Sequence, residues 1–297
     1  MPVLNMGGNR IGLNICEDIW YPEGTITAQT LIGNAEIVVN ISSSPYHAAK
    51  AESRKRMLAT RAADNIAIVA FNNLVGGQDE LVFDGASMIF DQKGTLLCQG
   101  KSFEEDFVVT DLDLDAVFLQ RIHDTRRRKE KRDRNTQEDR VHVIELKKAR
   151  TKRKPPLPQK NPPTLSPMEE IYRALTVGVR DYVNKNGFEK VVIGLSGGID
   201  SSLVAAIAVD ALGKENVIGV FMPSVFTSSE SRDDAEALAA GFGIAFISIP
   251  ISDAFEAYER MLSGQFEGLK PDVTEENLQA RIRGTLIMAL STKFGWL

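Results

Sequence analysis

Residues 190–201 read KVVIGLSGGIDS, an apolar run that passes directly into a turn of glycine and serine. Residues 190–195 have the continuous apolar character of a buried strand. The Ala-rich residues 201–212 have the composition and length of a helix. The stretch therefore predicts a strand, a tight loop and a helix in direct succession.

The loop between that strand and that helix has the composition of an anion-binding site. Its glycines let backbone N–H groups approach phosphate oxygens, its hydroxyls add donors, and the helix presents its positive N-terminal end. No Gly-Lys-Ser/Thr sequence closes the loop, so it is not the P-loop of kinases and GTPases. A tight strand-to-helix turn with an ordinary helix cap is the alternative. The candidate phosphate-binding residues are Gly194, Leu195, Ser196, Gly197, Gly198, Ile199, Asp200 and Ser201.

The second half of the chain alternates between strands and helices. Residues 217–222 and 244–249 are predicted strands, residues 231–240 a helix, and residues 168–185 a helix that precedes the first strand. Such alternation predicts a parallel sheet with right-handed crossovers. In sheets of this class ligands bind at the carboxyl ends of the strands, which is where the loop lies.

The first half of the chain has more strands and fewer helices. One helix is predicted at residues 48–64, and residues 91–94 form the turn of a hairpin. The mixture predicts packed sheets with helices outside them. The predicted strands are residues 10–16, 35–41, 66–71, 82–90, 95–99 and 107–111.

A proline-rich stretch separates the two halves. Proline fixes φ and lacks a backbone donor, so neither a helix nor a central strand continues through it. The sequence therefore predicts a domain at residues 1–150, a linker at residues 151–167 and a second domain at residues 168–297.

The chain has a net charge of -5, but one of its segments is strongly basic. Residues 121–154 hold 15 Lys/Arg against 6 Asp/Glu, a net charge of +9. Such a segment is typical of nucleic-acid binding, of a membrane surface or of a solvated helix face. The solvated face is favoured, because acidic residues interrupt the run and no aromatic residue is available for base stacking.

The composition of the 297 residues, 43% of them hydrophobic, is that of a globular protein. Two cysteines, Cys16 and Cys98, are too few for a disulfide framework and suit a reducing compartment. No apolar run approaches the roughly 18–20 residues of a membrane span, and no leader sequence follows Met1. We therefore expect a cytoplasmic protein without a membrane partner.

Residues 196–201 (SGGIDS) resemble the pyrophosphate loop of the N-type ATP pyrophosphatases. The resemblance implies ATP as a substrate that is cleaved between its α- and β-phosphates. AMP is then placed on a carboxylate, which gives that carboxylate a good leaving group. The resemblance also implies magnesium, with Asp200 as the carboxylate that helps to hold it. An acidic residue at a helix start is equally a good cap, so both roles of Asp200 stay open.

Three further stretches, residues 169–188, 220–229 and 275–284, resemble the synthetase domain of the glutamine-dependent NAD synthetases. The resemblance places Asn277 where this family contacts deamido-NAD. Asn277 and Arg281 share one helical face, and arginine suits a diphosphate or a carboxylate. An ordinary amphipathic helix with a solvated polar face is the alternative.

A cysteine ends an apolar strand of the first domain, within residues 11–20 (IGLNICEDIW). A lone cysteine is commonly a small buried hydrophobic residue. These residues also resemble the nucleophile segment of the nitrilase superfamily, and in particular the glutaminase domain of the NAD synthetases. The resemblance implies that the thiolate of Cys16 attacks the glutamine amide and frees ammonia. Residues 40–50 resemble the glutamine-binding segment, with Ser44 and Lys50 at contact positions.

The resemblance as a whole implies an α/β protein. Its first domain is the C-terminal part of a nitrilase-like α-β-β-α sandwich, and its second is a doubly wound parallel-sheet ATP-pyrophosphatase domain. The implied activity is that of a glutamine-hydrolysing NAD synthase, a carbon–nitrogen ligase that amidates deamido-NAD with ammonia from glutamine. The implied partners are glutamine, deamido-NAD and further copies of the chain, with no nucleic acid.

The family's glutaminase triad is Glu, Lys and Cys in chain order, and the 15 residues before Cys16 contain neither Glu nor Lys. We therefore expect an internal piece of a longer protein, with negligible glutaminase activity of its own. Two alternatives stay open. One is a catalytically incomplete fragment that only binds nucleotide. The other is a different pyrophosphatase-loop enzyme, such as a tRNA-modifying enzyme, which would account for the basic segment.

Overall fold

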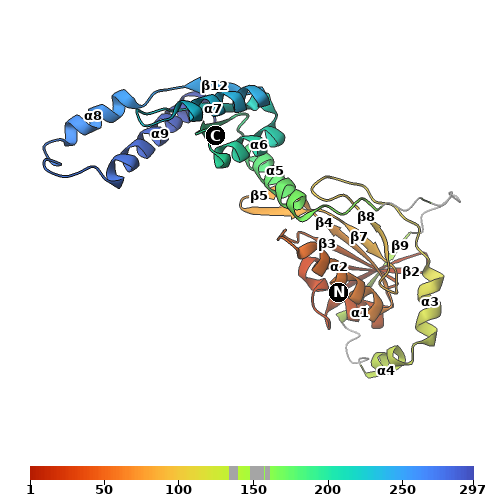
Figure 1. Ribbon diagram of the computed structural model, residues 1–297. Helices are drawn as coiled ribbons and strands as arrows, with labels where there is room; N and C mark the ends of the chain where they lie inside the picture. The colour runs from red at the N-terminus through yellow and green to blue at the C-terminus, as the bar shows by residue number, and fades with distance from the viewer. Residues whose placement is uncertain (134–139, 148–156, 158–160) are drawn as a thin grey trace. The chain divides into compact units, whose positions relative to one another are not determined.

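The computed structural model describes residues 1–133, 140–147, 157 and 161–297 (Figure 1). The chain forms two compact units, each described here by itself. Unit 1 comprises Met1–Gly76 and Glu80–Ala174, and unit 2 comprises Gly77–Asp79 and Leu175–Leu297. Most of the predicted linker at residues 151–167 lies outside the described residues, so the predicted domain limits stay a prediction.

Unit 1 is built on a sheet whose strand order is β8-β7-β4-β3-β2-β1-β9 (Figure 1). Its seven strands are β1 (Pro2–Met6), β2 (Asn9–Ile15), β3 (Ile37–Ser42), β4 (Ile68–Asn73), β7 (Met88–Phe90), β8 (Leu96–Gln99) and β9 (His142–Leu146). The central strands β2, β3 and β4 run parallel to one another. Parallel neighbours carry their carboxyl ends to the same edge of a sheet, so the chain leaves all three strands on one side.

Helices α1 (Thr25–Leu31) and α2 (Lys50–Asn65) pack on this sheet and bury its central strands. Val38, Leu58 and Phe71, from β3, α2 and β4, are at most 2% exposed and belong to one apolar core. The remaining elements are a 3-10 turn η1 (Cys16–Ile19), two helices, α3 (Leu114–His123) and α4 (Thr125–Asp133), and a hairpin of β5 (Val75–Gln78) and β6 (Leu81–Asp84). The last two residues of β5 belong to unit 2.

Several features of unit 1 differ from the sequence-based expectation. The predicted strand at residues 82–90 is divided between β6 and β7, which belong to different sheets. Residues 107–111 form no strand, because they pair with no neighbour, and Phe107 is 84% exposed. Helix α1 was not predicted, because six of its seven residues are buried and it shows no polar face. Its Gln29 is fully buried and donates hydrogen bonds to the carbonyls of Pro2 and Leu13 at 3.1 and 2.6 Å.

The basic segment contributes two arginines to the interior of unit 1. Arg121 donates to the carbonyls of Ile66 and Ala35 at 2.9 and 2.6 Å, and Arg127 donates to the carbonyl of Thr30. Thr30 and Ile66 lie at the carboxyl ends of α1 and α2, where backbone carbonyls lack helical partners and the helix dipole favours a cation. These two arginines therefore have a structural role.

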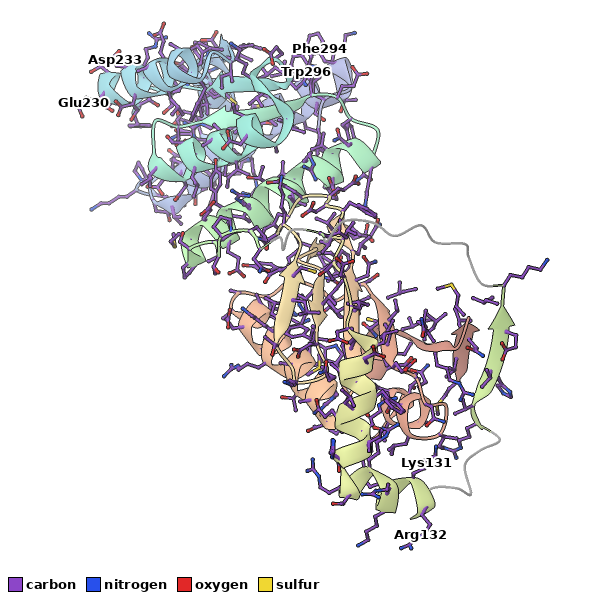
Figure 2. All side chains as sticks on the ribbon, turned by 90° about the vertical axis from the view of Figure 1, so that its right-hand side faces the viewer. Lys131, Arg132, Glu230, Asp233, Phe294 and Trp296 are labelled. Carbon is purple, nitrogen blue, oxygen red and sulfur yellow. The ribbon has the colours of Figure 1, made fainter. Side chains whose placement is uncertain are left out.

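The other described basic residues of α4 are exposed, as the solvated-face interpretation expects. Figure 2 shows Lys131 and Arg132 in the last turn of α4, at the periphery of unit 1. Residues 134–139 and 148–154 of the basic segment lie outside the described residues. The absence of a nucleic-acid partner stays a prediction.

Unit 2 is a parallel sheet in the order β10-β11-β12, with strands β10 (Val191–Leu195), β11 (Val217–Phe221) and β12 (Ala245–Ser248). Its helices are α5 (Pro167–Lys185), whose first residues belong to unit 1, α6 (Ile199–Leu212), α7 (Ser229–Phe242), α8 (Ser252–Leu262) and α9 (Val273–Phe294). A short 3-10 turn, η3 (Lys214–Asn216), precedes β11. The predicted strand–helix alternation is therefore present.

Alternate residues of these strands enter two separate cores. Leu195 and Phe221 pack with Ala205 of α6 on one face, whereas Val220 packs with Ile282 of α9 on the other. Side chains of a strand alternate between its faces, so helices on both sides require strands that are apolar throughout. This requirement explains the unbroken apolar run at residues 191–195.

The described C-terminal residues lie along the edge strand β10. The backbone of Leu297 donates to Lys190 and accepts from Val192, both at 2.9 Å. The rings of Phe294 and Trp296 stack beside it with centroids 4.5 Å apart (Figure 2). Among the described residues, no helix combines the length and the apolar character that crossing a membrane requires.

Arg121→Met tests the structural role of Arg121. We expect it to lower the free energy of unfolding of unit 1 by about 2 kcal/mol, because the carbonyls of the buried residues Ile66 and Ala35 lose their donor. Urea unfolding followed by circular dichroism measures the change. Arg128→Met, at an exposed position of α4, is the matched control and should change the midpoint little. Equal midpoints for both variants would contradict the structural role.

Candidate functional site

Cys16 lies where β2 ends, at the edge shared by the parallel strands of unit 1. Its φ angle is 44°, in the left-handed region that residues other than glycine rarely adopt. Backbone strain of this kind persists only where the surroundings hold it, and it gathers at functional sites. The half-buried Cys16 is therefore presented on a sharp strand-to-helix turn.

Two charged side chains hold this turn. The carboxylate of Asp18 accepts a hydrogen bond from the backbone N–H of Ile15 at 2.9 Å, which closes the turn across Cys16. Arg61, from α2, donates to the carbonyls of Ile19 and Trp20 at 3.0 and 2.7 Å. Both ends of the turn are thereby fixed to the body of unit 1.

A buried chain of polar side chains lies behind Cys16. The side-chain amide of Asn40, on β3, donates to the carbonyl of Cys16 at 3.3 Å and to the side chain of Asn14 at 2.7 Å. The hydroxyl of Ser42 donates to Asn40 at 2.7 Å. Sequence reasoning did not single out these residues, although polar residues near the ends of two apolar strands were a visible signal.

Ser44 and Lys50 lie on the segment that leaves β3. Ser44 is 2% exposed, and its backbone N–H donates to the side-chain oxygen of Asn73 at 2.9 Å. The ammonium of Lys50 donates to the carbonyl of Pro45 at 2.8 Å and lies 5.7 Å from the ring centroid of Trp20. These contacts fix the two predicted glutamine-binding residues.

The surroundings of Lys50 lower its pKa. Burial and the nearby Arg54 guanidinium lower the pKa of Lys50, whereas Asp84 and Cys16 oppose that shift. The ammonium is therefore close enough to Cys16 for their charges to interact. Unit 1 brings together all three of its predicted site residues, Cys16, Ser44 and Lys50.

The glycine–serine loop of unit 2 follows β10 and ends at the first turn of α6, as predicted. The hydroxyl of Ser201 accepts from the N–H of Ser196 at 3.2 Å and donates to the carbonyl of Gly198 at 3.0 Å. The hydroxyl of Ser196 in turn accepts from the N–H of Gly198 at 3.2 Å. The loop is therefore preformed by its own hydroxyls.

Gly197 is required at its position for two reasons. Its φ is 79°, and an added Cβ would lie 2.5 Å from the carbonyl oxygen of Ser231. Ser231 belongs to the first turn of α7, whose N-cap Ser228 accepts from the N–H of Ser231 at 3.1 Å. The N-terminal ends of α6 and α7 thus approach each other at the loop, and both favour negative charge there.

A pocket of about 420 Å³ opens beside this loop. Such a volume falls in the range of small-molecule sites. Arg283, from α9, donates through Nε to the carbonyl of Met222 at 3.0 Å, and burial lowers its pKa. Arg283 lies within residues 275–284, which resemble the synthetase domain, but the sequence predicted no role for it. The pocket is lined by Gly194, Leu195, Ser196, Phe221, Met222, Thr227 and Arg283.

Asn277 is exposed and lies six residues before Arg283 on α9, a rise of about 9 Å along the helix. No contact described for it reaches the loop. Asp200 is exposed in the first turn of α6. Within the described residues no group of three or more His, Cys, Asp and Glu could hold a metal ion. Asp200 therefore fits magnesium only as a single protein ligand, which is compatible with an ion held mainly by substrate phosphates.

Two parts of the chain match two different protein families. Residues 1–121 match the carbon-nitrogen hydrolase family, and residues 171–297 match the NAD synthase family. Each match covers one of the two candidate sites. The predicted fold class, a nitrilase-like domain followed by a parallel-sheet pyrophosphatase domain, is confirmed.

Similar proteins match over almost the whole chain. A glutamine-dependent NAD(+) synthetase from Thermotoga maritima is 51% identical over 99% of this chain and 50% of its own length. The corresponding protein of Aquifex aeolicus is 45% identical over 99% of this chain and 51% of its own length. A solved glutamine-dependent NAD+ synthetase from Acinetobacter baumannii, in complex with ADP, is 37% identical with a TM-score of 0.80 over 99% of this chain and 49% of that one.

The chain spans about half the length of the curated relatives that it matches. The resemblance inferred from the loop and from the cysteine segment is confirmed by these matches. Residues 1–121 thus match the carbon-nitrogen hydrolase family and residues 171–297 the NAD synthase family, and 99% of the chain is similar to glutamine-dependent NAD(+) synthetases.

Proposed function

We propose that this chain is part of a glutamine-hydrolysing NAD synthase, a carbon–nitrogen ligase. It carries the nucleophile of the glutaminase half-reaction and the phosphate loop of the synthetase half-reaction, whereas the 15 residues before Cys16 supply neither the Glu nor the Lys of the triad. The proposal rests on the presence of two kinds of site in one chain. Unit 1 holds a cysteine in a left-handed turn beside a lysine, and unit 2 of the same chain holds a preformed loop in which Gly197 cannot be replaced without displacing α7. A nucleophile and an anion cradle are what the two half-reactions need.

Cys16 is the nucleophile of the first half-reaction. The thiol proton passes to a base, the role of the family's Glu, which the 15 residues before Cys16 do not supply. The thiolate attacks the side-chain carbonyl carbon of glutamine, and the proton returns to the departing nitrogen, which leaves as ammonia when the carbon–nitrogen bond breaks. Water then hydrolyses the thioester to glutamate and restores Cys16. Ser44 and Lys50 hold the glutamine, because the Lys50 ammonium suits a carboxylate and Ser44 supplies polar groups beside it.

The loop of unit 2 binds ATP for the second half-reaction. Its backbone N–H groups and the ends of α6 and α7 hold the phosphates, while the remaining guanidinium nitrogens of Arg283 face an anion in the pocket. The carboxylate of deamido-NAD attacks the α-phosphorus and pyrophosphate leaves; ammonia then displaces AMP to give NAD. Asn277 contacts deamido-NAD. Magnesium beside Asp200 would neutralise phosphate charge when bound.

The assembly and location of the protein are also proposals. As in the family resemblance, we expect a homo-oligomer and a cytoplasmic enzyme with glutamine and deamido-NAD as its partners. Salt-dependent RNA binding by the basic segment would instead favour a tRNA-modifying enzyme.

Gly197→Ala tests the phosphate loop. The added methyl group must displace the start of α7 and strain a positive φ, so we expect ATP affinity to fall by at least about tenfold. Isothermal titration calorimetry with ATP measures it. Gly241→Ala in α7 is the matched control, since nothing lies within 4 Å of its added Cβ. Equal affinities for the two variants would contradict phosphate binding at the loop.

Arg283→Met tests the pocket beside the loop. The substitution keeps an apolar stem but removes the charge, and we expect ATP to bind about tenfold more weakly. Arg281→Met, on the exposed face of the same helix, should leave the ATP dissociation constant within about twofold. The assignment fails if ATP binds to Arg283→Met as it binds to wild type.

Cys16→Ser tests the nucleophile. Diazo-oxonorleucine, the diazoketone analogue of glutamine, alkylates a thiolate with loss of nitrogen gas, so wild-type protein should gain one adduct at Cys16. Peptide mass spectrometry locates that adduct. Cys98→Ser is the matched control and should react as wild type does, because Cys98 is fully buried and burial raises the pKa of its thiol. An adduct that persists in Cys16→Ser would argue against the assignment.

A further inference from the structure

A buried ion pair lies beneath the candidate glutamine site. Arg54, on α2, is 0% exposed and binds both oxygens of Asp84, at the end of β6, with distances of 3.0 and 2.6 Å. Its guanidinium also lies 5.6 Å from the ring centroid of Phe71. The cost of removing both charges from water offsets much of their attraction, so a buried ion pair is weak evidence for a role in stability. Its contacts with neighbouring side chains are therefore the better guide to its role.

Asp84 fixes the orientation of one neighbouring amide. Its carboxylate accepts a hydrogen bond from the side-chain nitrogen of Asn73 at 3.2 Å. An ionised carboxylate can only accept, so Asn73 must turn its NH2 group toward Asp84. Its oxygen then points the other way, and it accepts from the backbone N–H of Ser44 at 2.9 Å. The ion pair thus orients Asn73 so that its side-chain oxygen, and not its NH2 group, faces the backbone N–H of Ser44.

The same pair also reaches the second glutamine-binding residue. Lys50 lies four residues before Arg54 on α2, and residues at this spacing share a helix face. Arg54 lowers the pKa of Lys50 and Asp84 raises it, so both charges of the pair act on the Lys50 ammonium. Ser44 and Lys50 therefore depend on one buried cluster of Arg54, Asp84 and Asn73.

We infer that Arg54, Asp84 and Asn73 are positioning residues that set the affinity of unit 1 for glutamine without contacting the reacting atoms. This inference rests on the proposed function. The cluster holds the backbone of Ser44 in place, whereas the turn of Cys16 is held by other residues, Asp18, Arg61 and Asn40. Loss of the cluster should therefore weaken glutamine binding and leave the thiol as reactive as before.

Asn73→Ala tests this separation, because it removes the link to Ser44 and leaves both partners of the buried ion pair in place, so that no buried charge loses its partner. We expect the diazo-oxonorleucine concentration that gives half the maximal labelling rate of Cys16 to rise about tenfold. The maximal rate, and the rate of alkylation by iodoacetamide, which needs no glutamine site, should each stay within about twofold of wild type.

Asn65→Ala is the matched control. Asn65 and Asn73 are both 6% exposed, and Asn65 bonds Thr30 and the carbonyl of Arg61 at the opposite end of α2. The half-saturating concentration of diazo-oxonorleucine for Asn65→Ala should equal that of wild type, although Asn65→Ala and Asn73→Ala both lose stability.

Three results would overturn the inference. Equal half-saturating concentrations for wild type and Asn73→Ala would overturn this inference and leave the proposed function standing. An equal increase in Asn65→Ala, or an equal loss of iodoacetamide reactivity in Asn73→Ala, would show a general structural effect and would also overturn it. A wild-type Cys16 that the analogue does not label would instead overturn the proposed function, and the inference with it.

Discussion

Parallel strands end at a common edge, and both candidate sites depend on that constraint. In unit 1, Asn14 is paired with Asn40, and Ser42 with Asn73, across the neighbouring strands β2, β3 and β4. Polar residues at equivalent heights are therefore brought together, although they lie far apart in the sequence. In unit 2 the same constraint brings the loop after β10 beside Met222, which follows β11. The chemistry of each unit thus gathers where its strands stop.

The left-handed turn at Cys16 needs compensation from its surroundings. A strained backbone position costs on the order of 1–3 kcal/mol, and one intramolecular hydrogen bond contributes about 1 kcal/mol. Asp18, Arg61 and Asn40 together provide four hydrogen bonds at or next to this turn. This is enough to offset the strain, so the turn is held in its left-handed conformation.

Local patterns could be predicted from the sequence, whereas partnerships between distant residues could not. The strand, loop and helix of residues 190–212 follow from an apolar run, glycines and alanines that are adjacent in the chain. Helix α1 was missed because its polar Gln29 lies inside and satisfies carbonyls of two strands. Residues 107–111 have the composition of a strand, but a strand also needs a neighbour. The clusters around Asn40 and Asn73 come from three different elements, and no short window of sequence contains them.

The two candidate sites are fixed in place by different physical means. The turn and the glutamine segment of unit 1 rely on buried polar side chains, and a buried group that loses its partner costs about 1–3 kcal/mol. Sensitivity to substitution should therefore extend from Cys16 to residues such as Asn73 that touch no substrate. The loop of unit 2 relies on backbone N–H groups and on the close approach of two helices at Gly197. The hydroxyls of Ser196 and Ser201 shape the loop, and Arg283 adds charge in the adjoining pocket, but within the loop sensitivity should be greatest at the glycine whose replacement moves the backbone. Substitutions that conserve size but change polarity should therefore impair the Cys16 site of unit 1. Substitutions that add volume should impair the phosphate loop of unit 2.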